Sequence, residues 1–132
     1  MFKDKIIQID RDSVCMGDDC MPHCKEITIN RETSIREFLA ILADYVPTME
    51  NVIWAVQSNK GLCGYIITDQ EAKAAFEVYG EDTNVGRRGI KNVMCKYYYP
   101  SKFFYIDGNS GETVEKYPEC AKFLEKVRRE NE

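Results

Sequence analysis

The sequence lacks any long apolar run. Nothing in its 132 residues approaches the ~20 consecutive apolar residues that a membrane-spanning helix needs. The first residues, M-F-K-D-K-I-I-Q-I-D, interrupt their apolar side chains with charges, whereas a signal peptide carries an unbroken apolar core. We therefore expect a cytoplasmic protein that has no membrane partner. Because we expect no secretory signal, the six cysteines are predicted to be reduced thiols.

Residues that could form a complete catalytic set are also lacking. The chain has one histidine, His23, and no C-x-x-C pair, which disfavours a thioredoxin-type redox role. A cysteine nucleophile needs a histidine within hydrogen-bond reach. His23 stands beside Cys24 and near Cys20, and sequence neighbours rarely adopt that geometry. P-loop and dinucleotide-binding fingerprints are missing as well, so the sequence offers no motif for phosphate or cofactor binding.

What the chain does have is the composition of one ordinary globular domain. Hydrophobic residues make up 44% and charged residues 30%, which argues against disorder and predicts a single domain over residues 1–132. The 22 acidic and 18 basic residues give a net charge of −4. This mild acidity argues against a nucleic-acid partner and suits a basic protein partner, since complementary charge speeds encounter.

Hydrophobic periodicity predicts an α+β fold. Alternating or β-rich runs predict six strands, paired as three hairpins, at 3–10, 25–31, 52–57, 62–68, 93–99 and 102–107. Helical spacing and capping signals predict three helices, at 35–46, 70–79 and 118–127. The order ββ-α-ββ-α-ββ-α favours a mostly antiparallel sheet with the helices packed on it.

Several positions carry more specific expectations. Ser34 and Glu37 form a capping box for the first helix. Trp54 is expected in the core, and Gly64, inside a strand, indicates a bulge or a close backbone approach. Asp69 is expected to cap the second helix. The Gly-rich and charged segment 80–92 is expected to be a mobile loop.

The stretch 12–25, D-S-V-C-M-G-D-D-C-M-P-H-C-K, concentrates the reactive side chains at the tip of the first hairpin. Cys15, Cys20, His23 and Cys24 are of the types that bind zinc, but their spacing matches no recognised ligand pattern. We therefore predict no metal ligand set and treat the cysteines as structural. A metal- or thiol-dependent protein that uses this loop remains the alternative hypothesis.

Two charged segments suggest contacts with other molecules. Asp18 and Asp19 lack the further oxygen ligands of a calcium loop, and exposed carboxylates on a hairpin tip suit docking to Arg or Lys of a partner. From Arg87 to Lys102 the chain is basic and rich in tyrosine, a composition that can bind single-stranded nucleic acid. The overall acidity opposes that role, and aromatic residues that alternate along a strand usually face the core.

The run S-V-C-M-G-D-D-C-M-P-H at 13–23 and the strand V-I-W-A-V at 52–56 resemble segments of small bacterial immunity proteins. These belong to polymorphic-toxin and contact-dependent growth inhibition systems, and the resemblance covers the first half of the chain. It implies a non-catalytic cytoplasmic protein that needs no cofactor and blocks one cognate toxin domain by binding it. The contact residues we predict for this role are Asp18, Asp19, His23, Glu81, Asp82, Arg87 and Arg88. A structural or regulatory subunit of another complex would show the same sequence features, so this alternative stays open.

Overall fold

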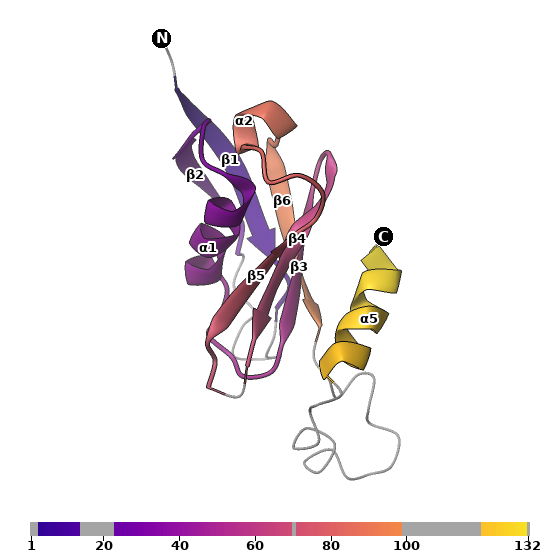
Figure 1. The fold of residues 1–132 in the computed structure, drawn as a ribbon. Helices are drawn as coiled ribbons and strands as arrows, with labels where there is room; N and C mark the ends of the chain where they lie inside the picture. Colours follow the sequence, from indigo (N-terminus) through magenta and orange to yellow (C-terminus); the bar gives the residue numbers. More distant parts are fainter. Residues whose placement is uncertain (1–2, 14–22, 70, 99–119, 132) are drawn as a thin grey trace.

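The computed structural model describes residues 3–13, 23–69, 71–98 and 120–131. One six-stranded sheet, in the order β2-β1-β6-β3-β4-β5, carries helices on both faces (Figure 1). The strands are β1 (Asp4–Arg11), β2 (Lys25–Asn30), β3 (Ile53–Ser58), β4 (Gly61–Thr68), β5 (Ala74–Val78) and β6 (Asn92–Tyr98). The helices are α1 (Ile35–Tyr45), α2 (Val85–Arg88) and α5 (Cys120–Asn131). Among these residues, no helix is long and apolar enough to cross a membrane.

The predicted α+β class with a mostly antiparallel sheet is confirmed, and only the β1–β6 pair of the described strands is parallel. The expected hairpins β1–β2 and β3–β4 are present. The first strand of the third predicted hairpin is β6, which pairs with β1 on one side and with β3 on the other. Its predicted partner strand, 102–107, lies outside the described residues.

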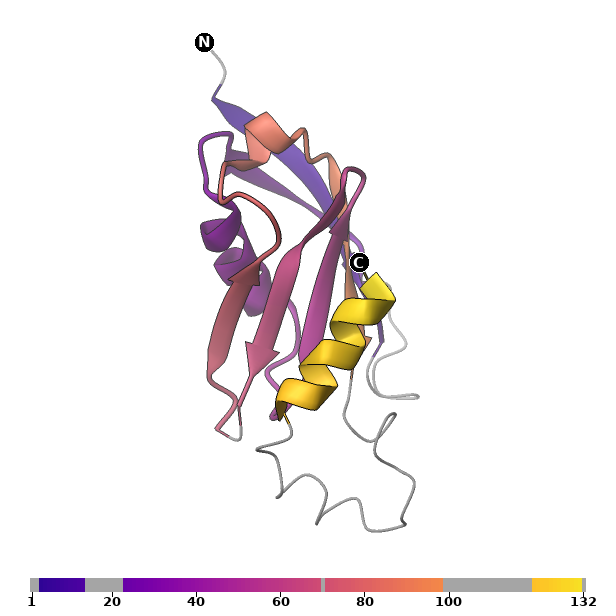
Figure 2. The same ribbon diagram turned by 45° about the vertical axis from the view of Figure 1, so that its right-hand side comes forward.

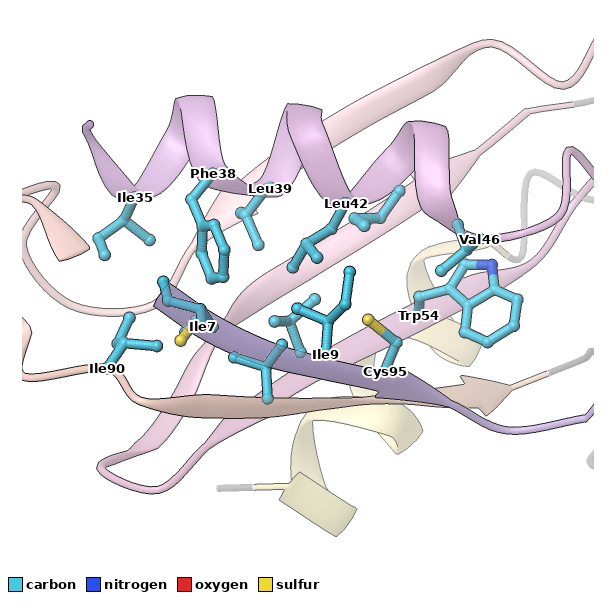
Figure 3. Close-up of a cluster of buried hydrophobic side chains, with 14 of the residues drawn as sticks. Ile7, Ile9, Ile35, Phe38, Leu39, Leu42, Val46, Trp54, Ile90 and Cys95 are labelled. Atoms are coloured by element: carbon cyan, nitrogen blue, oxygen red, sulfur yellow. The ribbon is translucent and has the colours of Figure 1, made fainter. Parts of the chain in front are cut away.

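Helix α1 forms where the capping box predicts it. The Ser34 hydroxyl accepts a hydrogen bond from the Glu37 amide at 3.1 Å. Five apolar side chains at helical spacing are buried against the sheet, as the sequence predicts: Ile35, Phe38, Leu39, Leu42 and Val46. Figure 3 shows this stripe pointing at Ile7 and Ile9 of β1. This contact forms the larger of two hydrophobic cores.

The second core lies on the opposite face of the sheet, under α5. Strand β3 is buried on both sides: Trp54 and Val56 face α1, whereas Ile53 and Ala55 belong to the core beneath α5. Figure 2 shows α5 lying over β3 on the face away from α1. The Val127 side chain is fully buried there. The described residues therefore form three layers: α1, the sheet and α5.

Polar contacts hold the C-terminal end of α5 in place. The Asn131 amide donates to the Tyr98 hydroxyl at 3.0 Å and accepts from the Gln57 amide at 2.9 Å. Arg128 forms an ion pair with Glu77 of β5. These contacts anchor the helix to three strands, because Gln57, Glu77 and Tyr98 lie on β3, β5 and β6.

The predicted helix at 70–79 is wrong, because half of this segment, Ala74–Val78, is strand β5. Asp69 does act as a cap, but of a turn: its carboxylate accepts from the Glu71 and Lys73 amides at 2.8 and 2.9 Å. Ala72 then adopts a positive φ of 63°, which a right-handed helix does not allow. The chain reverses there, and β5 pairs antiparallel with β4.

The segment 80–92 is also different from the expected mobile loop. It contains α2, whose first turn is capped by Asn84, which accepts from the Arg87 amide at 2.7 Å. The Arg88 guanidinium donates to the backbone carbonyls of Leu62, Tyr79 and Glu81. Arg88 therefore ties this segment to β4 and to the residue that follows β5.

Gly64 marks the close approach that the sequence indicates. The β3–β4 register shifts between Val56 and Gln57, opposite this glycine. A Cβ atom at Gly64 would lie 2.3 Å from the Glu77 carbonyl oxygen and 2.9 Å from Cδ1 of Leu39. A side chain at this position would push β5 and α1 away from β4.

We predict that Gly64→Ala lowers the free energy of unfolding by about 2–3 kcal/mol, because the backbone of β5 has to move to admit the methyl group. Urea unfolding followed by tryptophan fluorescence measures this change. Ala74→Ser, at an exposed position of the same sheet, is the control and should stay within about 0.5 kcal/mol. A loss for Gly64→Ala as small as that of the control would contradict the close approach.

Candidate functional site

The contact residues predicted from the sequence lie at two opposite ends of the sheet. His23 precedes the first residue of β2. Helix α2 lies beyond the last residue of that strand, where the Gly86 amide donates to the Arg31 carbonyl at 2.9 Å. Figure 1 shows α2 beside the start of β1, far from the end of that strand. A six-residue strand spans about 20 Å, so His23 and the charged residues of 81–88 do not form one contiguous site.

The residues at the α2 end have structural roles in part. Asp82 accepts a hydrogen bond from the Arg36 amide at 3.0 Å, which satisfies a donor in the first turn of α1. Arg88 is occupied by the three carbonyls described above. Glu81 and Arg87 have exposed side chains. The α2 end therefore offers two of its four predicted residues in an orientation open to a partner.

At the other end of the sheet, three residues that we call the loop clasp connect the two sides of the 14–22 segment: Ser13, His23 and Tyr45. The Ser13 hydroxyl and Nε2 of His23 are 3.0 Å apart. The Tyr45 hydroxyl, from the last turn of α1, donates to the His23 carbonyl. The Lys25 ammonium lies 5.8 Å from the centre of the Tyr45 ring, within the range of a cation–π contact. Ser13 and His23, which flank the segment, are therefore bonded to each other, and His23 is also bonded to α1.

Asp12, which precedes Ser13, is hydrogen-bonded to strand β6. Its amide donates to the Cys95 carbonyl at 3.0 Å, and its carboxylate accepts from the Tyr97 amide at 2.8 Å. The Arg11 guanidinium donates to the Asp12 carbonyl at 3.1 Å. These bonds extend the parallel β1–β6 pairing beyond the end of β1, and they fix the direction in which the chain leaves the sheet.

Electrostatics keep the Tyr45 hydroxyl protonated. Burial, followed by the negative charge of Asp10, raises the pKa of Tyr45 from 10.0 to about 12. Both effects disfavour the phenolate, because it would be poorly solvated and repelled by the carboxylate. Tyr45 is therefore a hydrogen-bond donor to His23 throughout the physiological pH range.

Two of the described cysteines, Cys63 and Cys95, are buried and unreactive. Burial is the main cause that raises the pKa of Cys95 from 9.0 to about 12, and it also raises the pKa of Cys63. Such thiols are poor nucleophiles, because the thiolate is the reactive form. Cys24 is exposed and free. Within residues 3–13, 23–69, 71–98 and 120–131, no group of three His, Cys, Asp or Glu residues could hold a metal ion.

Four of the residues singled out in the loop lie outside the described part of the chain: Cys15, Asp18, Asp19 and Cys20. Their proposed roles in docking or in metal binding therefore stay predictions. Sequence reasoning identified His23 but missed its partners. Tyr45 stands one residue before the apolar stripe ends at Val46, and a tyrosine in that position reads as part of the core.

Trp54 is buried at the same end of the sheet, as predicted. Its ring centre lies 5.1 Å from that of Tyr97, in a tilted arrangement. In the part of the chain that the structure describes, no group accepts a hydrogen bond from its indole N–H. An unpaired buried donor costs about 1–3 kcal/mol. Burial of the large ring against Tyr97 must offset this cost.

Comparisons with protein-family models, with curated proteins and with solved structures found no match for this chain. The resemblance to immunity proteins is therefore neither confirmed nor contradicted, and the function is argued below from the residues.

We predict that Tyr45→Phe removes the hydrogen bond to the His23 carbonyl and lowers the free energy of unfolding by about 1 kcal/mol. Amide hydrogen exchange at residues 11–13 and 23–25 should speed up at the same time. Tyr79→Phe is the matched control, because the Tyr79 side chain is exposed and no hydrogen bond of its hydroxyl is described. Equal effects of the two substitutions would show that the clasp does not hold the loop.

The pKa of Tyr45 also predicts how stability depends on alkaline pH. The folded protein retains this proton up to about pH 12, whereas the unfolded chain loses it near pH 10. The contribution of Tyr45 is therefore complete below pH 10 and is lost as the pH rises from about 10 to about 12. Urea unfolding at several alkaline pH values should show a shallower decline for Tyr45→Phe than for the wild type. The Tyr79→Phe control should keep the wild-type slope.

Proposed function

We propose that this chain is a non-catalytic protein-binding domain, an immunity protein that neutralises a cognate bacterial toxin by direct one-to-one docking. The observation that supports this best is the loop clasp. Ser13 and His23 flank the 14–22 segment: their side chains are hydrogen-bonded to each other, and the His23 carbonyl is bound by Tyr45 of α1. Binding residues are commonly presented in this way, on a loop whose ends a rigid scaffold positions.

Charge supports the same proposal. The net charge is −4, and the clasped segment carries Asp18 and Asp19 with no basic residue between positions 14 and 22. A basic toxin surface would be steered toward such a segment, because opposite charges increase the rate of encounter. Carboxylates that pair with arginine in a bidentate geometry also give strong, directional contacts.

The clasp residues themselves fit a role in positioning better than a role in catalysis. His23 lies beside a serine hydroxyl, but its backbone carbonyl is simultaneously bound by Tyr45. Both side-chain contacts close the loop at its base. A metal- or thiol-dependent protein that uses Cys15, Cys20, His23 and Cys24 is the alternative that the next experiment separates.

Native mass spectrometry of the chain, expressed alone and with the product of the adjacent gene, tests the proposal. We expect a one-to-one complex in which this chain has its metal-free mass. The proposal fails if no complex forms and the chain instead carries the mass of one zinc ion that disappears in His23→Ala. That result would establish a metal site in the loop.

We further predict that Asp18→Asn with Asp19→Asn weakens the complex at least about tenfold, mainly through slower association, because the steering charges are removed. Surface plasmon resonance at two salt concentrations measures both rates. Glu32→Gln with Glu71→Gln removes the same charge from exposed positions elsewhere and is the control. Equal rates for the two double variants would exclude the acidic pair from the docking site.

A further inference from the structure

The two helical layers cover the sheet unequally. Helix α5 packs on the β3 side of the outer face, where its contacts reach β5 and β6. On the outer face of β1 and β2, no element of the described residues packs (Figure 2). The β1–β2 register places Ile7 opposite Ile27 on the α1 side, so the alternate residues point outward. We call the outward set the β1–β2 face: Asp4, Ile6, Gln8, Asp10, Glu26, Thr28 and Asn30.

The charges of β1 and β2 are sorted between the two sides of the sheet. Every ionisable residue of the β1–β2 face is acidic: Asp4, Asp10 and Glu26. Every ionisable residue of these strands on the α1 side is basic: Lys5, Arg11 and Lys25. Alternation of the two signs along each strand produces this segregation, because successive side chains point to opposite faces. The β1–β2 face is therefore negative although the strands themselves are nearly neutral.

The basic side is reinforced by residues from other elements. Burial lowers the pKa of Lys5, and the positive charges of Arg31 and Lys91 lower it further. Positive charge is thus concentrated on one side of β1 and negative charge on the other. A basic partner would therefore be attracted to the β1–β2 face, since the opposite side of these strands is covered by α1.

An apolar residue stands in the middle of the acidic face. Ile6 is 61% exposed, more than any other large hydrophobic residue of the described chain, and its cross-strand partner is Thr28. Asp4 lies two residues away along β1, a distance of about 7 Å. One exposed isoleucine is ordinary on a protein surface. Here, however, it is placed among carboxylates that would attract a partner of opposite charge.

We propose that the β1–β2 face docks a basic surface of a protein partner, with an apolar side chain of that partner packed on Ile6 and flanking Arg or Lys residues paired with Asp4, Asp10 and Glu26. This inference rests on the proposed binding function and names a surface for it. The face is continuous with the loop clasp, since β1 ends two residues before Ser13 and β2 begins two residues after His23.

The β1–β2 face is large enough for part of a protein–protein interface. Strands β1 and β2 together present a surface of about 25 Å by about 10 Å, or roughly 250 Å². A standard interface covers about 800 Å² on each partner. The β1–β2 face would thus supply about a third of a standard interface, as one part of a larger contact area.

Ile6→Lys tests the proposal, because it removes the apolar contact and places a positive charge against a basic partner. We expect the complex with the product of the adjacent gene to weaken at least about a hundredfold, mainly through faster dissociation. Ile41→Lys is the matched control: it makes the same substitution at the exposed position of α1, where Ile41 is 42% exposed. It should bind as the wild type does. Circular dichroism and urea unfolding verify that both variants are folded.

A second measurement separates failure of this inference from failure of the proposed function. A short synthetic peptide with a central leucine between arginine and lysine residues is titrated into the isotope-labelled chain, and amide chemical shifts are recorded. Shifts should concentrate at residues 4–10 and 26–30, and should be lost in Ile6→Lys but kept in Ile41→Lys. If the wild-type chain forms no complex but shows these shifts, the docking face is supported and the proposed toxin partner is excluded.

Three results would overturn the docking face. One is an undiminished complex with Ile6→Lys, which would leave the binding function intact and exclude the face. Another is a peptide that perturbs other residues or none. The last is a concentration-dependent shift at the same amides without peptide, which would assign the face to self-association of the chain.

Discussion

The packing of the apolar stripe of α1 against the sheet determines the arrangement of nearly everything else in this protein. It decides which side of each strand is buried, and a strand shifted by one residue would present the opposite set of side chains. Ile7 and Ile9 lie beneath the stripe, so the charged residues of β1 and β2 point to one side or the other according to their position alone. The segregation of charge across β1 and β2 is thus a consequence of core packing.

The same helix also controls the loop end of the sheet. Its apolar stripe places the last turn of α1 above the start of β2, and Tyr45 can then bind the His23 carbonyl. The tyrosine serves both layers at once, because its ring lies near Lys25 and its hydroxyl is shielded enough for burial to raise its pKa. The packing of α1 and the position of His23 are therefore coupled through one side chain.

Local signals in the sequence were sufficient for some elements. The Ser34–Glu37 capping box and the spacing of the apolar residues predicted α1 correctly, and Gly64 correctly indicated the bulge. In these cases the deciding contacts are few residues apart, or concern a single position where only glycine fits. Sequence patterns report such contacts directly.

Elements that depend on distant partners were missed. Alanines at 72, 74 and 75 favour a helix locally, but the turn at Asp69 and the pairing of β5 with β4 outweigh that preference. The insertion of β6 between β1 and β3 joins segments more than thirty residues apart, so no local pattern announces it. Arg88 was predicted to contact a partner, whereas its guanidinium binds the carbonyls of Leu62, Tyr79 and Glu81, which no local pattern indicates.

The residues of the candidate site also differ in whether local sequence features or distant contacts identify them. His23 stood out because it is the only histidine, and Tyr45 did not, because its role appears only when α1 lies across the start of β2. The sorted charges of β1 and β2 are written in the alternation of the sequence, yet the side that faces solvent could be assigned only after the positions of α1 and α5 were known.

An acidic face with a single apolar residue has a physical advantage over a fully apolar one. A large exposed apolar surface promotes aggregation when no partner is present, whereas the polar side chains of the β1–β2 face keep that half of the sheet stable in water. Charge acts at long range and therefore controls the rate of encounter, while short-range contacts at Ile6 would control the lifetime of the complex. A protein that must stay free until its partner arrives, and must then bind quickly, needs these two properties on separate side chains of one surface.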